Sequence, residues 1–131
     1  MNEVAQSIFS TLVAGTALVS LLGGTAIYQQ QAPNGTPLPY VVFNKQSGGP
    51  EYVDPHDRRD LVYYVRAYAE SAKAAGAIDS ACENLLHRQS IVVTGWNTVQ
   101  CYRTTDLESV DNRPDGEPVF MSGGFYRVRI T

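Results

Sequence analysis

The chain has 131 residues, of which 44% are hydrophobic and 18% charged, and its formal net charge is -3. This length suits one compact domain that buries its own core. The mild acidity argues against a dedicated nucleic-acid-binding module, since such modules bind phosphates through a basic surface. No apolar run approaches the ~20 residues that a membrane-spanning helix needs. The first six residues contain no Lys or Arg, which argues against a secretory signal. We therefore expect a protein that is made in the cytoplasm and has no membrane segment.

The amino-terminal segment has the apolar spacing of a helix. Val4, Ile8 and Leu12 recur at intervals of four residues and so fall on one helical face. Gly15 interrupts this pattern, and a second short helix is predicted through residues 18–22 before a pair of glycines. A third and longer helix is predicted for Ser71–Gln89, which has small and aliphatic residues along one side.

Five segments have the composition of strands, being rich in β-branched and aromatic residues. They are Ala26–Gln30, Pro39–Asn44, Asp60–Ala69, Trp96–Thr104 and Phe125–Ile130. In the third segment the odd positions from Leu61 to Ala69 are apolar and are expected to face the core, while the even positions are amphipathic. The order of helices and strands predicts an α+β fold. We expect a single domain over residues 1–131, with a mixed, mostly antiparallel sheet and helices packed on one of its faces.

Two polar segments, Gln46–Asp60 and Asp106–Pro118, are predicted to be exposed loops because Gly, Pro and charged residues are frequent in them. Loops of this length are uncommon in a small domain and are often functional. They provide the candidate residues for contact with a partner. These are Glu51, Asp54, His56, Asp57, Arg58 and Arg59 in the first segment, and Asp111, Arg113 and Asp115 in the second.

The sequence contains one cluster that resembles a catalytic or metal site, Asp54, His56 and Asp57. A metal site normally needs three or four well-placed ligands, and Pro55 keeps these three side chains from sharing one helical face. We therefore predict no catalytic, metal or cofactor site, and no enzyme activity. The two cysteines, Cys82 and Cys101, lack the spacing of a metal or redox motif. We expect two buried thiols, with a structural disulfide as the alternative.

Several predicted strands combine arginines with aromatic residues. The residues concerned are Tyr64, Arg66, Tyr68, Arg103, Arg127 and Arg129. Arginine and tyrosine are enriched at protein interfaces, and a sheet with helices on one face leaves its other face free for a partner. The alternative is an ordinary solvent-facing sheet surface. We interpret these residues as a candidate subunit interface.

The order of these segments also resembles a known family. The similarity lies in Leu21-Leu22-Gly23-Gly24, the strands at residues 26–28 and 39–43, the strand at residues 61–68, the alanine-rich helix at 71–86 and the last strand. In this layout the chain is similar to the tail terminator, or tail-completion, proteins of long-tailed phages and phage-like particles. The resemblance covers nearly the whole chain and implies an α/β or α+β sandwich fold. The two polar segments match no motif of the family.

The resemblance implies a structural virion protein located in the neck region of the tail. Such proteins form a hexameric ring on the head-proximal end of the tail tube, stop the addition of tube subunits and provide a docking surface for the neck. The implied partners are further copies of the chain, the tail tube protein and a head-proximal neck (stopper) protein. DNA would pass through the ring without specific binding, and no cofactor is implied. Three alternatives stay open: another neck or head–tail joining protein, a small enzyme that uses the Asp54–Asp57 cluster, and a cytosolic protein with no role in a virion.

Overall fold

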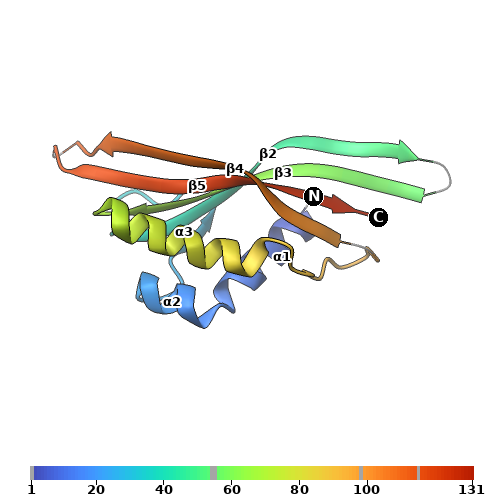
Figure 1. Cartoon of the computed structure of the whole chain (residues 1–131), viewed down its shortest axis with the longest axis horizontal. Coiled ribbons are helices and arrows are strands. Elements are labelled where there is room, and N and C mark those ends of the chain that lie inside the picture. Colours follow the sequence, from blue (N-terminus) through green and yellow to red (C-terminus); the bar gives the residue numbers. More distant parts are fainter. Residues whose placement is uncertain (1, 54–55, 98, 115) are drawn as a thin grey trace.

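The structure, a computed structural model, describes residues 2–53, 56–97, 99–114 and 116–131. In chain order these residues form α1 (Asn2–Val13), α2 (Thr16–Leu22), β1 (Ile27–Gln29), β2 (Tyr40–Val53), β3 (His56–Ala69), α3 (Ala72–Leu86), β4 (Val99–Asn112) and β5 (Pro118–Ile130) (Figure 1). The strands make one sheet in the order β1-β2-β3-β5-β4. β1 runs parallel to β2, and the other neighbouring strands are antiparallel. The predicted α+β class and the mixed, mostly antiparallel sheet are confirmed.

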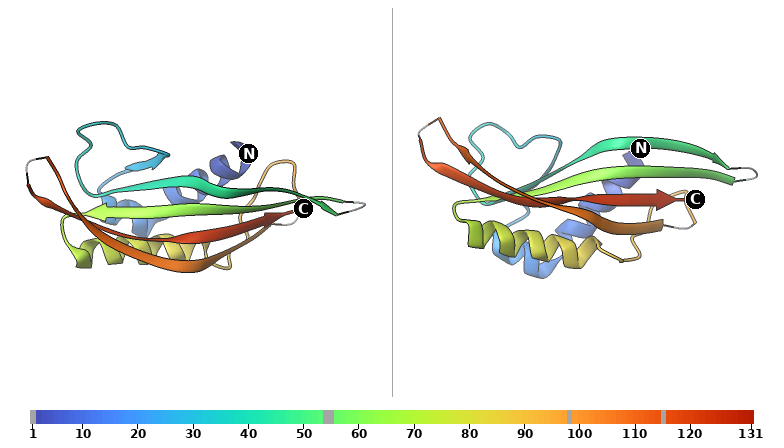
Figure 2. Two further views of the ribbon diagram at one scale, coloured as in Figure 1. Left: turned by 90° about the horizontal axis from the view of Figure 1, so that it is seen from above. Right: turned by 45° about the horizontal axis from the view of Figure 1, so that its top comes forward.

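The hydrophobic core lies between the sheet and the helices. In β3 the side chains of Leu61, Tyr63 and Val65 are at most 2% exposed, as their alternation predicts. They belong to the same buried cluster as Ile8 of α1 and Ile78 of α3. In Figure 1 the three helices lie below the sheet, and the left view of Figure 2 looks at the sheet from above. We call the sheet face that carries the even-numbered residues of β3 from Val62 to Tyr68 the open face.

The boundaries of the helices follow from local chemistry. The side chain of Ser71 caps α3 by accepting a hydrogen bond from the backbone N–H of Ala74 at 3.1 Å. α2 ends at Leu22 and is capped by Gly23, whose φ of 72° lies in the left-handed region that glycine adopts without steric cost. Among the described residues, no single helix is long and apolar enough to cross a membrane. α1 and α2 meet that criterion as a pair, with a bend of 77° between them.

The two segments predicted as long loops are mostly paired strands, and these predictions were wrong. β2 and β3 pair from Tyr40 opposite Tyr68 as far as Val53 opposite His56. β4 and β5 pair as far as Asn112 opposite Pro118. The two long hairpins extend to opposite ends of the molecule (Figure 1). Most residues at 45–50 and 104–112 are exposed, so these parts of the hairpins lack the alternating apolar pattern by which a half-buried strand is recognised in a sequence.

Candidate subunit interface

Strand register brings tyrosines from three strands together on the open face. The rings of Tyr28 in β1 and Tyr40 in β2 have centroids 6.4 Å apart, and those of Tyr40 and Tyr68 are 5.2 Å apart. In β3, the ring of Tyr64 lies 5.0 Å from that of Phe125 in β5. We define the aromatic patch as Tyr28, Tyr40, Asn44, Tyr64, Arg66, Tyr68, Met121 and Phe125. The structure therefore brings together three of the predicted interface residues, those of β3.

Arg66 lies at the centre of the aromatic patch and is held in one orientation. Its Nη2 donates a hydrogen bond to Asn44 Oδ1 at 3.0 Å, and its Nη1 donates one to Tyr68 Oη at 3.3 Å. The guanidinium carbon lies 4.8 Å from the centroid of the Tyr64 ring, a distance at which a cation is attracted to the ring. A rigid arginine among aromatic rings is a frequent anchor of protein interfaces, because little side-chain entropy is lost when a partner binds.

Two tyrosines of the patch, Tyr40 and Tyr64, keep their protons at neutral pH. Burial raises the pKa of Tyr40 and of Tyr64 above 10.0, and the positive charge of Arg66 opposes this increase in both. Arg113, which follows β4, also lowers the pKa of Tyr40. Arg113 is therefore close enough for its charge to influence the patch, although it is distant from Tyr40 in the sequence.

Arg127 and Arg129 lie farther along the open face and are ion-paired within the chain. Arg127 Nε donates to Asp60 Oδ1 at 2.8 Å, and its Nη2 bonds the other oxygen of the same carboxylate. This pairing raises the pKa of Arg127 above its ordinary value. Arg129 Nε lies 3.8 Å from Asp60 Oδ2. The side chains of Arg127 and Arg129 are 42% and 34% exposed, so both can still contact a partner.

Arg103, the sixth predicted interface residue, needs a correction. Its side chain is 6% exposed and lies between β4 and α3, away from the open face. Its two terminal nitrogens each donate to one oxygen of Asp79 at 2.8 Å, and its Nε donates to Asp106 at 2.6 Å. Burial lowers the pKa of the guanidinium, but the hydrogen bond and charge of Asp79 outweigh this effect and raise it. We therefore remove Arg103 from the candidate interface and assign it to the core.

Two glycines of β5 lie where a side chain would collide with neighbouring atoms, and one of them, Gly124, makes room for the Arg103 side chain. A Cβ atom on Gly124 would lie 2.6 Å from Arg103 Nε and 2.5 Å from the carbonyl oxygen of Thr105. A Cβ atom on Gly123 would lie 2.3 Å from the carbonyl oxygen of Val65. The register of β4 shifts between Arg103 and Thr105, which is a β-bulge. The bulge turns the residues after Arg103 to the opposite faces of the sheet from those that strict alternation assigns to them.

The residues predicted to contact the tube or neck lie on the two hairpins. Within the described residues, Glu51, His56, Asp57, Arg58 and Arg59 belong to β2 and β3, Asp111 belongs to β4, and Arg113 follows β4. The backbone N–H of Arg113 donates to the carbonyl of Glu117 at 2.8 Å and closes the second hairpin. Asp54 and Asp115 lie outside the described residues. The structure therefore separates the two sets instead of joining them into one site.

Within the described residues, no group of three or more His, Cys, Asp or Glu side chains could hold a metal ion. Cys82 and Cys101 are both free and buried, so the predicted pair of buried thiols is confirmed. Burial raises the pKa of each thiol to about 12, which makes both poor nucleophiles. His87 follows α3 as its capping residue, and its Nδ1 accepts a hydrogen bond from the backbone N–H of Arg103 at 2.9 Å.

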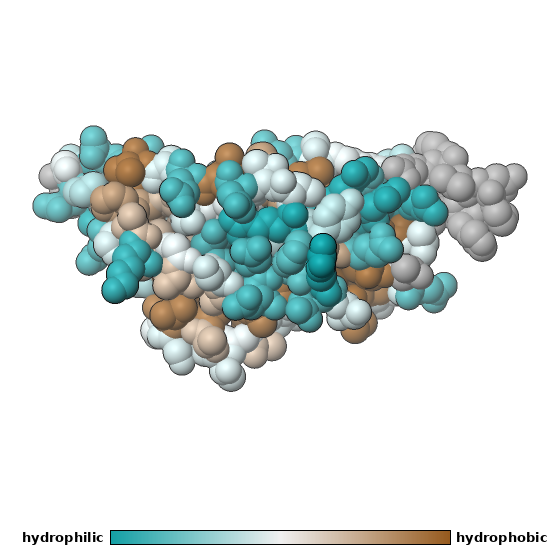
Figure 3. Space-filling model, in the orientation of Figure 1, coloured by the Kyte–Doolittle hydropathy of each residue, from teal (hydrophilic) through white to brown (hydrophobic). Residues whose placement is uncertain are grey.

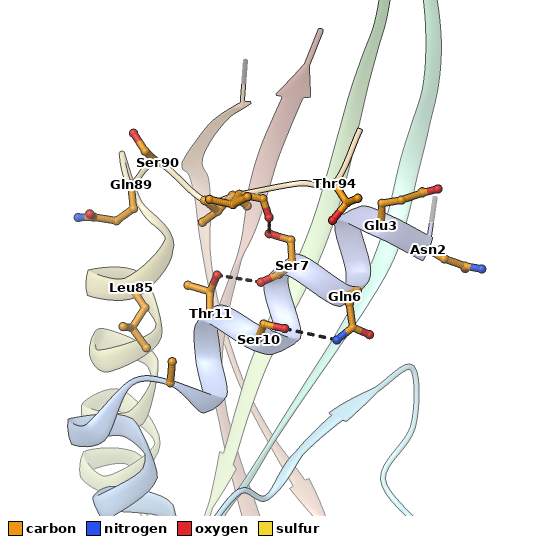
Figure 4. A pocket seen from close by; sticks show the side chains of 13 residues that line it. Asn2, Glu3, Gln6, Ser7, Ser10, Thr11, Leu85, Gln89, Ser90 and Thr94 are labelled. Atoms are coloured by element: carbon orange, nitrogen blue, oxygen red, sulfur yellow. Dashed lines mark hydrogen bonds between the residues drawn. The ribbon is translucent and has the colours of Figure 1, made fainter. Parts of the chain in front are cut away.

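A groove of about 820 Å³ runs between α1 and residues 85–94 (Figure 4). The residues that line the groove are mainly neutral. Two of them are joined by a hydrogen bond, which Ser7 Oγ donates to the carbonyl of Val92 at 2.6 Å. Glu3 is the one ionisable side chain among its lining residues, so the groove lacks a paired acid and base. Figure 3 shows hydrophobic residues gathered over α2, where Leu21 is 47% exposed.

Sequence reasoning missed several members of the aromatic patch. Tyr28 and Tyr40 were placed in strands, but nothing in the sequence indicates that β1 pairs with β2 in parallel and so aligns their rings. Asn44 and Met121 reach Arg66 and Tyr64 through the same register: the Tyr64 hydroxyl lies 3.8 Å from the sulfur of Met121. Had the register been known, the alternation of β3 would have indicated these neighbours.

The family model for tail completion protein gp17 matches residues 6–128. A chain from the virion of a native gene transfer agent particle superposes with a TM-score of 0.76 at 16% sequence identity, over 94% of this chain and 90% of its own. A second solved chain superposes with a TM-score of 0.55 at 11% identity, over 95% of this chain and 94% of its own. At these identities the two structures show a shared fold. No curated protein matches the sequence.

Proposed function

Because the chain belongs to the tail completion protein gp17 family, we propose that it forms a ring of six copies on the head-proximal end of a phage tail tube. The family identifies it as a structural protein of the phage tail or neck and not as an enzyme. In the proposed role the ring stops the addition of tube subunits and provides the docking surface for the neck. DNA passes through without specific binding, in keeping with a net charge of -3.

The observation that carries this proposal is the aromatic patch on the open face. Most core residues of the sheet face the helices, whereas four tyrosines and Arg66 lie on the opposite side. A surface of this composition is favoured for contact with another protein. A ring of identical subunits requires a contact between two different surfaces of neighbouring copies. We assign one of these surfaces to the open face around Tyr64, Arg66, Tyr68, Arg127 and Arg129.

The two hairpins support contacts along the axis of the tail. They extend to opposite ends of the sheet, so one copy can reach two different partners at the same time (Figure 1). We assign the contacts with the tail tube protein and the neck protein to these hairpins. One contact uses Glu51, Arg58 and Arg59, and the other uses Asp111 and Arg113.

Deletion of the coding sequence from the parent phage tests the proposed role. Negative-stain electron microscopy is expected to show overlong tails of variable length without heads. Tails of normal length beside full, unattached heads would identify another head–tail joining protein of the neck instead. Normal infectious particles would refute any role in the virion.

Complementation of the deletion with charge-reversed variants tests the hairpin contacts. Arg58→Glu combined with Arg59→Glu is expected to abolish joining while leaving a folded monomer. Arg88→Glu is the matched control, because Arg88 is exposed and follows α3, outside the β2–β3 hairpin. Normal joining by the double variant would refute the assignment of the first hairpin.

A further inference from the structure

Arg66 differs in its partners from Arg103, Arg127 and Arg129, the other arginines predicted for the interface. Arg103, Arg127 and Arg129 each lie within ion-pair distance of an aspartate. In the described part of the chain, Arg66 pairs with no carboxylate, and the atoms that accept its hydrogen bonds are the neutral oxygens of Asn44 and Tyr68. Its Nε is buried and has no hydrogen-bond partner there. A partly buried guanidinium without a counter-charge favours a carboxylate as a further partner.

Exposed carboxylates are concentrated on β4, which forms one edge of the sheet. Asp106 is already paired with Arg103. Glu108 and Asp111 are exposed, and neither has an ion-pair partner among the described residues. Among the described residues, one surface therefore has an arginine without a carboxylate partner, and another has two carboxylates without a cationic partner.

The strand register keeps Glu108 and Asp111 apart from Arg66 within one copy. Arg66 is opposite Gly123 in β5, and Asp111 is opposite Val119 on the other side of β5. Four residues of strand separate these positions by about 13 Å along β5. Glu108, being opposite Ser122, lies on the face of the sheet that Arg66 does not occupy. A second copy of the chain has no such restriction.

We propose that the acidic edge of β4, through Glu108 and Asp111, docks on the aromatic patch of a second copy and supplies the carboxylate that pairs with Arg66. This inference rests on the proposed function, for which it specifies the contact between neighbouring subunits. The contact joins two different surfaces. Every pair of copies therefore still has one unoccupied β4 edge and one unoccupied aromatic patch, and further copies can be added in the same way. Such a contact closes into a ring when the rotation between copies allows it.

Charge reversal on each surface tests the pairing. The variants are Arg66→Glu and the double variant Glu108→Arg, Asp111→Arg, with Glu3→Arg, Glu70→Arg as the control, since both of these acids are exposed and lie outside β4. Self-association of the full chain is measured by analytical ultracentrifugation and native mass spectrometry, with circular dichroism to verify folding. Each test variant is expected to self-associate at least about 30-fold more weakly than the original chain, and the control like the original chain.

Mixing the two test variants in equal amounts gives the sharper readout. The Arg66→Glu variant has a reversed patch and an original acidic edge, and the other variant has an original patch and a reversed edge. When the two alternate, every contact therefore joins opposite charges. Assembly of the mixture, but of neither variant alone, is the expected result. If Arg66→Glu does not fold, Arg66→Met replaces it in the single-variant measurement, since it removes the charge and keeps an unbranched side chain beside Tyr64.

Three results would overturn the pairing: an original chain that stays monomeric at every concentration, test variants that assemble like the original chain, or a mixture that does not assemble. An Arg66→Glu variant that assembles normally but fails to cap tails would show that the patch binds another virion protein, and would overturn the pairing as well. The self-association and mixing measurements do not depend on tail length, which tests the proposed function separately. A ring that is insensitive to the substitutions would leave that function standing.

Discussion

Removal of the Asp79 carboxylate tests whether the buried ion pair holds α3 to the sheet. Asp79→Ala deletes the acceptor of two hydrogen bonds from Arg103, each 2.8 Å long, and of one from Ser122 at 3.0 Å. The side chains of Asp79 and Arg103 are only 11% and 6% exposed, so water cannot fully replace the lost partner. Breaking a buried pair in this way costs about 3–5 kcal/mol.

The lower end of this range applies, because Asp106 and Glu83 remain near the guanidinium at 2.6 and 3.8 Å. We expect Asp79→Ala to lower the free energy of unfolding by about 3 kcal/mol. The urea midpoint, followed by circular dichroism, should then fall by about 1–2 M. Replacing both partners, as Asp79→Leu with Arg103→Met, should cost less than Asp79→Ala alone, since no buried charge is left unpaired. A loss below about 1 kcal/mol for Asp79→Ala, or a double variant less stable than the single, would refute this reasoning.

Two further predictions concern stability. Gly123→Ala places a Cβ atom 2.3 Å from the carbonyl oxygen of Val65 and should destabilise the fold by about 1–3 kcal/mol. The Cβ atom of Gly76→Ala in α3 meets nothing within 4 Å, so this variant should be more stable by up to about 1 kcal/mol. Equal urea midpoints for the two variants and the original chain would contradict both expectations. The pKa of Cys82 and of Cys101 is raised from 9.0 to about 12, so the folded state keeps protons that the unfolded state loses. The contribution of the thiols to the free energy of unfolding should therefore be fully present below pH 9. Between pH 9 and 12 the free energy of unfolding should fall by up to about 1.4 kcal/mol per pH unit for each thiol. An unchanged slope in the double Cys→Ala variant would show that the thiols are not responsible.

The sequence predicts strands and helices that bury one face, and it does not predict strand segments that are exposed on both faces. β3 was recognised because its odd-numbered residues are apolar from Leu61 to Ala69, and these residues are buried. The outer part of β4 was read as a loop, because residues 104–112 are exposed except for the half-buried Leu107. Pairing with β5, a contact distant in the sequence, makes this segment a strand. Local composition does not contain that information.

The candidate site was predicted in part for the same reason. Tyr64, Arg66 and Tyr68 share the face opposite the core because they alternate with buried residues, and that relationship is local. Arg103 also lies in a strand, but the face that it occupies depends on a bulge at the next residue and on an aspartate 24 positions away. The sequence shows neither feature, so its aromatic neighbours suggested a surface position that is incorrect.

The unpaired edge of β4 has a consequence for the chain before it assembles. An exposed edge strand can accept a strand from any other molecule, which leads to open-ended β-stacking. When two β4 edges approach each other, the negative charges of Asp106, Glu108 and Asp111 on one copy repel those on the other. The bulge after Arg103 also disturbs the regular register that strand pairing between copies needs. These acids therefore oppose edge-to-edge stacking of β4 strands, and this protection weakens as salt screens their charges.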